Sequence, residues 1–119
     1  MQTDCSCPAQ FAVDLFGGKW KTTILYQIAT AEEPLRFNAL RRRIPKITQK
    51  MLTQQLRQLE RDGLVNRTYH PTIPPKVEYN LTEMGQSFRE PVTTLGYWAL
   101  ENLTKIDTAR ENYDSNIDT

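Results

Sequence analysis

The apolar positions in the first part of the chain recur at the spacing of helices. Pro8 favours a helix start, because the N–H that proline lacks has no partner in a first helical turn, and the glycine pair at 17–18 ends that helix. A second helix is expected over residues 19–30. A short third helix is expected over residues 38–43, and Pro45 prevents it from continuing.

The clearest helical pattern lies in the middle of the chain. Leu52, Leu56 and Leu59 recur at i, i+4 and i+7, which places them on one side of a helix and predicts a buried stripe. Thr48 precedes this helix and can cap it, since a threonine hydroxyl accepts a hydrogen bond from a free backbone N–H. Gly63 follows the last leucine and is typical of a helix C-terminal cap.

The pattern then changes from helix to strand. Residues 64–69 are rich in strand formers, and residues 77–81 alternate between apolar and polar side chains. The proline-rich segment between them cannot be helical. The two strands are therefore predicted to form a hairpin, whose tip is stiffened by Pro74 and Pro75.

The last part of the chain predicts one long helix. Thr82 is expected to cap it, and Pro91 should kink or break it. Beyond it the chain is polar and acidic, so residues 107–119 are expected to form a frayed tail. Residues 1–6 are expected to be a flexible arm. Residues 7–106 would then form a single domain, which suits a chain of this length.

The predicted order of elements is helix, helix, short helix, tight turn, longer helix, hairpin and helix. A short helix, a turn and a longer helix with a polar outer face are typical of a helix-turn-helix, whose second helix enters the major groove of DNA. A hairpin directly after that helix can act as a wing. The sequence therefore predicts a mainly α fold with a small β-hairpin, a winged helix-turn-helix domain.

Charge is unevenly distributed along the chain. The 119 residues include 15 lysines and arginines and 14 aspartates and glutamates, a formal net charge of +1. Nine of the basic residues but only two of the acidic ones lie within residues 36–67. Such a segment favours a polyanionic partner, and double-stranded DNA is the one that the predicted helix-turn-helix fits. The alternative is a basic face that is merely solvated.

Polar and basic side chains off the leucine stripe, in the helix before it and on the hairpin are expected to contact the DNA. Glutamine, lysine, threonine and arginine can read base edges or hold phosphates. The expected contacts are Arg36, Arg43, Thr48, Gln49, Lys50, Thr53, Gln54, Arg57, His70 and Lys76. For Arg41 and Arg42 a phosphate contact and a plain surface role are equally open.

Short motifs, taken in order along the chain, carry a resemblance to a known family. They are "CP" at 7–8, "GGKW" at 17–20, "IL" at 24–25, "RFNAL" at 36–40, "ITQKMLTQQLRQLERDGLV" at 47–65, "PPKVEYNLTEMG" at 74–85 and "LGYWAL" at 95–100. With them the chain closely resembles the HxlR-type winged-helix transcriptional regulators, relatives of the MarR group. The resemblance implies a homodimer held by terminal dimerisation helices, which binds a palindromic operator and represses or activates nearby genes.

The first and last predicted helices carry more apolar residues than a thin core can bury. A dimer interface is therefore expected to use both helices. The expected interface residues are Phe11, Phe88, Leu95, Tyr97 and Trp98. For Trp98 a place in the core is the alternative.

Cys7 is a candidate for redox sensing. It lies next to the first turn of a helix, where free N–H groups and the positive end of the helix dipole favour a thiolate, the form that reacts with electrophiles and oxidants. The resemblance implies the same role, because HxlR-type sensors of quinones, aldehydes or hypochlorite carry a cysteine at this place. The alternative is that Cys7 is a small packing residue without chemistry. If Cys7 is oxidised, Cys5 could form a disulfide with it. The two-residue spacing favours a disulfide between subunits, because a local ring would be strained.

Other functional classes find less support. No apolar run reaches the ~18–20 residues of a membrane helix, and the N-terminus has neither the basic start nor the apolar core of a signal peptide. A cytoplasmic protein without membrane contact is therefore expected. His70, Cys5 and Cys7 are too few for a structural zinc site, so no metal or other cofactor is expected.

Three alternatives to a redox-responsive DNA-binding regulator stay open. A thiol oxidoreductase would use Cys5 and Cys7, but the pair lacks the C-x-x-C spacing, so no enzyme activity is expected. A winged-helix module that binds protein is the second alternative. A regulator that responds to a non-covalent small ligand is the third.

Overall fold

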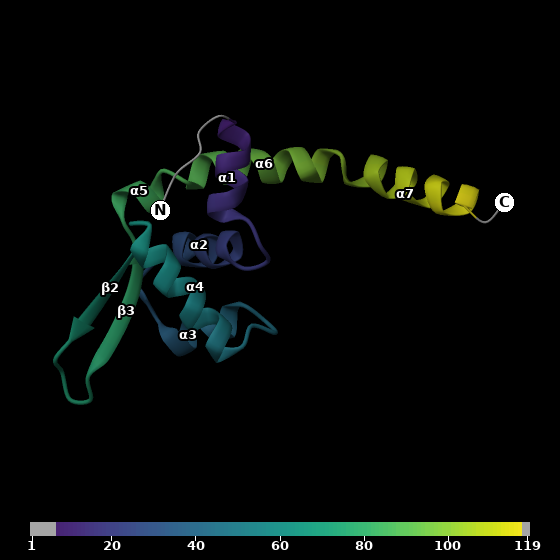
Figure 1. The fold of residues 1–119 in the computed structure, drawn as a ribbon. Helices are drawn as coiled ribbons and strands as arrows, with labels where there is room; N and C mark the ends of the chain where they lie inside the picture. Colours follow the sequence, from purple (N-terminus) through teal and green to yellow (C-terminus); the bar gives the residue numbers. More distant parts are fainter. Residues whose placement is uncertain (1–6, 118–119) are drawn as a thin grey trace. The chain divides into compact units, whose positions relative to one another are not determined.

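The computed structural model describes residues 7–117 of the chain (Figure 1). The chain divides into two compact units, residues 1–87 and 88–119. Its described part is mainly helical with a small antiparallel sheet, which confirms the predicted fold class. The predicted flexible arm, residues 1–6, lies outside the described residues.

The described part of the first unit begins with the helices that precede the hairpin. They are α1 (Pro8–Phe16), α2 (Lys21–Thr30), α3 (Phe37–Arg43) and α4 (Gln49–Arg61). Pro8 opens α1 and Gly17 is its C-cap, as predicted. Helix α2 begins later than predicted, because Gly18 adopts a left-handed conformation (φ 89°) and Trp20 is the N-cap.

Helix α4 has the predicted N-terminal cap and the predicted buried stripe. The Thr48 hydroxyl accepts a hydrogen bond from the Met51 N–H at 3.0 Å. Leu52, Leu56 and Leu59 are 0%, 2% and 0% exposed, so the spacing of the leucines correctly indicates the buried side. The opposite side of α4 is left free for other contacts.

The end of α4 is closed by two hydrogen bonds that reverse the chain. The Gly63 N–H donates to the Glu60 carbonyl oxygen and the Leu64 N–H to the Leu59 carbonyl oxygen, both at 3.0 Å. This is a Schellman motif, in which the residue after the cap is left-handed. Gly63 has φ 78° and fills that position, and the C-cap itself is Asp62.

Within the described residues, the sheet has three strands in the order β1-β3-β2, all antiparallel. The predicted hairpin corresponds to β2 (Val65–His70) and β3 (Lys76–Leu81). Strand β1 (Leu35–Arg36) was not expected, and it pairs with Tyr79 and Glu78 of β3. A strand of two residues has no period that a sequence pattern could reveal.

The core of the first unit lies between its helices and the sheet. Its most deeply buried side chains come from α2, α3 and α4, and they are Ile24, Leu25, Leu40, Leu52, Leu56 and Leu59. Burying one such side chain stabilises the fold by about 1.5–3 kcal/mol. The helix-turn-helix is therefore held by the same residues that form the core.

The predicted long helix after Thr82 is divided in the structure. Thr82 does act as a cap, because its hydroxyl accepts from the Gly85 N–H at 3.0 Å. The helix that it caps, α5 (Glu83–Gln86), is short, and α6 (Arg89–Glu101) begins only after Phe88. Pro91 lies in the first turn of α6, where its missing N–H costs nothing. The predicted break therefore occurs before the proline instead of at it.

The second unit continues as a helix where a frayed tail was expected. Helix α7 (Leu103–Ile117) includes residues 107–117 of the predicted tail. These residues contain no glycine or proline, and Leu103, Ile106, Tyr113 and Ile117 recur at a spacing that places them along one side of a helix. The acidic side chains between these apolar residues made the helical spacing hard to recognise in the sequence. No helix among residues 7–117 is both long and apolar enough to cross a membrane.

Candidate nucleic-acid interface

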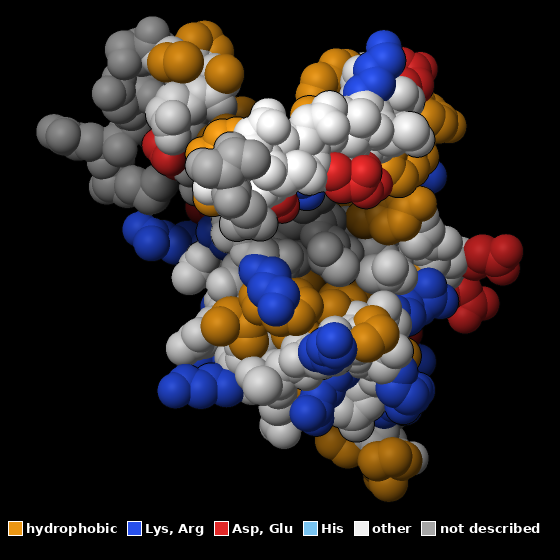
Figure 2. All heavy atoms as spheres, turned by 90° about the vertical axis from the view of Figure 1, so that its right-hand side faces the viewer, with side chains coloured by type: hydrophobic (Ala, Val, Ile, Leu, Met, Phe, Trp, Pro, Cys, Tyr) orange, Lys and Arg blue, Asp and Glu red, His pale blue; other side chains and the backbone are white. Residues whose placement is uncertain are grey.

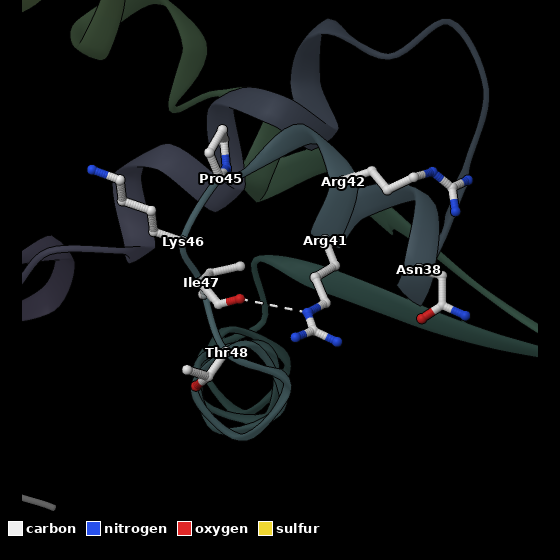
Figure 3. A pocket seen from close by; sticks show the side chains of 7 residues that line it. All are labelled: Asn38, Arg41, Arg42, Pro45, Lys46, Ile47 and Thr48. Carbon is white, nitrogen blue, oxygen red and sulfur yellow. Dashed lines mark hydrogen bonds between the residues drawn. The ribbon is translucent and has the colours of Figure 1, made fainter.

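The turn between α3 and α4 is anchored by two buried isoleucines. Ile44 and Ile47 are 2% and 4% exposed, and the Ile47 N–H donates to the Ile44 carbonyl oxygen at 3.3 Å. Arg41 Nε of α3 donates to the Ile47 carbonyl oxygen at 3.5 Å (Figure 3). Lys46 lies between the isoleucines with an exposed side chain. The turn therefore holds the start of α4 against the end of α3.

The free side of α4 carries polar and basic side chains. Lys50, Thr53, Gln54 and Arg57 recur at i, i+3, i+4 and i+7, so they share one face of the helix. Lys50, Gln54 and Arg57 are exposed and Thr53 is half-buried. This face has the donors, acceptors and positive charge that suit contact with base edges and phosphates.

A hollow of about 670 Å³ lies beside the start of α4. Its lining comes from α3, the turn and the cap of α4, and consists of Asn38, Arg41, Arg42, Pro45, Lys46, Ile47 and Thr48. Figure 3 shows Arg41 between Arg42 and Lys46, whose side chains point to opposite sides. We call this lining the turn hollow. No acidic residue belongs to it, so its electrostatic character is positive.

A second hollow, of about 470 Å³, joins α3 to the hairpin. We call it the wing hollow, and it is lined by Arg36, Phe37, Asn38, Ala39, Arg42, Pro75, Lys76 and Val77. The two hollows share Asn38 and Arg42. In Figure 2, lysine and arginine side chains gather over the lower part of the view, where Figure 1 places α3, α4 and the hairpin, and acidic ones are sparse there.

The hairpin carries a small cluster of charged side chains. His70 Nε2 lies 2.8 Å from Glu78 Oε1, and Lys76 Nζ lies 3.9 Å from the same oxygen. His70 and Lys76 face one another across β2 and β3. Near the tip, the Thr72 hydroxyl donates to the Pro74 carbonyl oxygen at 2.8 Å. Lys76 lines the wing hollow, and both Lys76 and His70 lie near the same Glu78 carboxylate, which His70 approaches more closely.

A second cluster joins the last turn of α4 to the sheet. Arg67 Nε lies 3.5 Å from Glu60 Oε1 in an ion pair, and Arg67 is opposite Tyr79 in the strand register. Burial of the Tyr79 ring raises the pKa of its hydroxyl above the usual 10.0, although the Arg67 charge acts in the opposite direction. The ion pair thus links β2 to the last turn of α4.

The comparison with protein families agrees with this geometry. Residues 15–107 match the profile of the family described as HxlR-like helix-turn-helix. The chain belongs to this family. It is therefore a transcriptional regulator with a helix-turn-helix fold, and the family resemblance seen in the sequence is confirmed.

Individual relatives support the assignment. The HTH-type transcriptional regulator YybR of Bacillus subtilis is 43% identical over 106 residues, which cover 89% of this chain and 83% of YybR. The solved structure of the redox regulator HypR in its reduced form has a TM-score of 0.77 at 42% identity, and covers 86% of this chain and 99% of HypR. The reduced form of the transcriptional regulator YodB from B. subtilis has a TM-score of 0.70 at 35% identity, covering 78% of this chain and 90% of YodB.

The structure of this HxlR-like regulator brings most of the expected DNA contacts to one region. Thr48 lines the turn hollow, and Arg36 and Lys76 line the wing hollow. Gln49 is exposed at the first position of α4, next to the polar face described above. Arg43 is exposed at the end of α3 but lines neither hollow, and His70 is engaged with Glu78.

The sequence left the role of Arg42 open and did not mark Asn38 or Lys46 as contacts. Asn38 and Arg42 line both hollows because they are four residues apart on one face of α3. This spacing was the available signal, but the run of three arginines gave no reason to prefer Arg42 over Arg43. Lys46 had no signal beyond its charge, since its backbone conformation is visible only in the structure.

The expected sensing and interface residues lie in different parts of the chain. Cys7 is exposed directly before α1 and is not in a disulfide, whereas Cys5 lies outside the described residues. Phe11 of α1 is half-buried. In the second unit Leu95, Tyr97 and Trp98 are 65%, 63% and 58% exposed, so Trp98 is not a core residue of that unit. Phe88 is partly exposed at the start of the same unit.

Proposed function

We propose that this chain is a sequence-specific DNA-binding regulator that acts as a homodimer on double-stranded operator DNA. The observation that carries the proposal is the polar face of α4, flanked by two hollows lined with arginine and lysine. A polar face of this kind fits the major groove, and the cations beside it fit the phosphate backbone. Neutralised phosphates release counterions, which supplies affinity for DNA of any sequence.

The proposed contacts divide into two groups. Lys50, Thr53, Gln54 and Arg57 would face base edges, where a good bidentate contact contributes about 1–3 kcal/mol of discrimination. The residues that would hold the backbone lie around them: Arg36, Arg42, Arg43, Thr48, Gln49 and Lys76. His70 would join them only when it is released from Glu78. The first group supplies sequence specificity and the second group supplies position on the duplex.

A homodimer is proposed because the second unit cannot bury its own apolar side chains. Neither α6 nor α7 has a buried residue among those described. Figure 1 shows α7 continuing away from the end of α6 instead of folding back along it. Leu100, Leu103, Tyr113 and Ile117 are each more than half exposed, as are Leu95, Tyr97 and Trp98. Such a surface requires a partner, and a second copy would present a matching one under two-fold symmetry.

Cys7 is proposed as the point at which electrophiles or oxidants act. Its side chain is exposed, and the structural relatives include one named as a redox regulator. With a quinone, the Cys7 thiolate would form a carbon–sulfur bond and one ring oxygen would take up a proton from solvent. The attacked ring carbon would then lose its hydrogen as a proton to the other oxygen, which leaves a hydroquinone thioether. A bulky adduct directly before α1 would disturb packing of that helix, which the proposed dimer uses.

The proposal is tested by binding of labelled promoter DNA at several salt concentrations, together with sedimentation of the free protein. We expect a dimer at micromolar concentration and an affinity that falls steeply as salt rises, because several phosphates are neutralised. A sedimentation coefficient of a monomer would contradict the dimer. Absence of DNA binding at low salt would contradict the proposed function itself and favour a module that binds protein.

A further inference from the structure

We propose that the turn between α3 and α4 is a seat for consecutive backbone phosphates of one DNA strand, with Lys46 as its central residue. This inference rests on the proposed function, and it assigns a binding role to a residue that the polar face of α4 does not include. Three observations carry it: the backbone conformation of Lys46, the rigidity of the turn, and the arrangement of cations around it.

Lys46 has φ 73°, in the left-handed region. A residue with a Cβ is disfavoured there, whereas glycine adopts it without strain. Among the described residues, the other left-handed positions are occupied by glycine, Gly18 and Gly63. A lysine at the third such position therefore indicates a use for its side chain, since strained residues concentrate at functional sites.

The turn leaves the Lys46 backbone little freedom. Ile44, two residues before Lys46, and Ile47, directly after it, are both buried. Pro45 restricts the backbone directly before Lys46. Arg41 Nε binds the Ile47 carbonyl oxygen across the turn. The left-handed conformation is thus imposed by its surroundings, and the exposed lysine side chain is presented at the surface.

The cations of the turn hollow are spread out instead of converging on one point. In Figure 3, Lys46 and Arg42 point to opposite sides of the hollow and Arg41 lies between them. Lys46 and Arg42 form no ion pair within residues 7–117. A single compact anion could not contact all three cations, whereas a strand that crosses the hollow would present successive phosphates to them. The geometry therefore favours an extended polyanion over free phosphate.

The test compares substitutions of Lys46 on a mixed-sequence duplex, because phosphate contacts do not depend on sequence. The dissociation constant is measured at several salt concentrations and the urea midpoint at one protein concentration. We expect Lys46→Gly to flatten the slope of log affinity against log salt by about 1.8, because the proposed dimer loses one phosphate contact in each of its two protomers. If the lines of wild type and variant meet at 1 M salt, the variant binds about sixtyfold more weakly at 0.1 M salt. The urea midpoint should be unchanged or higher, because the strain is relieved.

Two further variants separate charge from conformation. Lys46→Arg keeps the charge and should restore the wild-type slope. Asparagine tolerates the left-handed region, so Lys46→Asn should also show the flattened slope. This second neutral variant keeps the test decisive if Lys46→Gly does not fold. Lys105→Ala removes one exposed positive charge from α7 and should leave the slope unchanged. Inorganic phosphate added at constant ionic strength should not compete with the duplex.

The outcomes distinguish the inference from the proposed function. If the wild type binds the duplex with a steep slope and both neutral variants retain that slope, the seat is refuted and the proposed function stands. If the wild type does not bind DNA at all, both are refuted. Competition by inorganic phosphate would show that the hollow holds a compact anion, which contradicts an extended strand.

Discussion

The Thr82 hydroxyl is the contact whose loss can be predicted in most detail. Its Oγ1 donates to the Gly63 carbonyl oxygen at 2.6 Å and accepts from the Gly85 N–H at 3.0 Å. Gly63 closes α4 and Gly85 belongs to α5, so one hydroxyl joins the end of α4 to the segment that follows β3. Thr82→Val removes this hydroxyl and keeps the shape of the side chain.

The expected loss follows from the two hydrogen bonds. Removing a helix N-cap costs about 1 kcal/mol, and removing a partly buried hydrogen bond costs about the same. The free energy of unfolding should therefore fall by about 2 kcal/mol. For a urea dependence of about 1.5 kcal/mol per molar, the unfolding midpoint falls by about 1.3 M.

The assay is urea unfolding followed by circular dichroism at one protein concentration, because a dimer would make the midpoint depend on concentration. Thr82→Ser keeps the hydroxyl and should stay within about 0.5 kcal/mol of the wild type. Thr23→Val changes an exposed threonine of α2 and serves as the matched control. The reasoning is refuted if Thr82→Val loses less than about 0.5 kcal/mol, or if Thr82→Ser loses as much as Thr82→Val.

Three further predictions test other parts of the account. Burial raises the pKa of Tyr79, so the neutral hydroxyl stabilises the fold below pH 10.0 and this stability is lost as pH rises through the raised pKa. Tyr79→Phe should therefore flatten the alkaline decline of the urea midpoint, whereas exposed Tyr69→Phe should not; equal profiles would contradict this. Treatment with a quinone should abolish operator binding by the wild type but not by Cys7→Ser, and equal responses of the two proteins would make Cys7 a packing residue. Deleting residues 73–76 should weaken DNA binding and leave the fold and the dimer intact; unchanged affinity would argue against a wing.

Much of the fold could be predicted from the sequence because its signals are local. The leucine stripe of α4 and the Thr48 cap depend on spacing and on one side chain, and both are confirmed. Strand β1 depends on pairing with a segment more than forty residues later in the chain, so no local pattern marks it. The same holds for Lys46, whose conformation follows from the burial of its neighbours.

The C-terminal part shows how composition can mislead. The acidic residues from Asp107 onward suggested a tail, yet residues 107–117 lie on a helix whose apolar positions are widely spaced. Pro91 indicated a break but not its position, because a proline fits the first turn of a helix and disrupts the turn before it. Of the proposed DNA contacts, those on α4 could be predicted from helical spacing, whereas the wing hollow required the fold to bring Arg36 to Lys76.

The most direct test of the central claim is footprinting of DNA with and without the polar face of α4. Wild-type protein first selects a duplex from random sequences, and the protected bases are then mapped for the wild type and for a variant with alanine at Lys50, Thr53, Gln54 and Arg57. Alanine favours a helix and the leucine stripe is untouched, so circular dichroism should show an intact fold. The account predicts two half-sites about 34–36 Å apart for the wild type and loss of this protection in the folded variant. Protection of the same bases at the same concentration by the variant would show that α4 does not read the DNA.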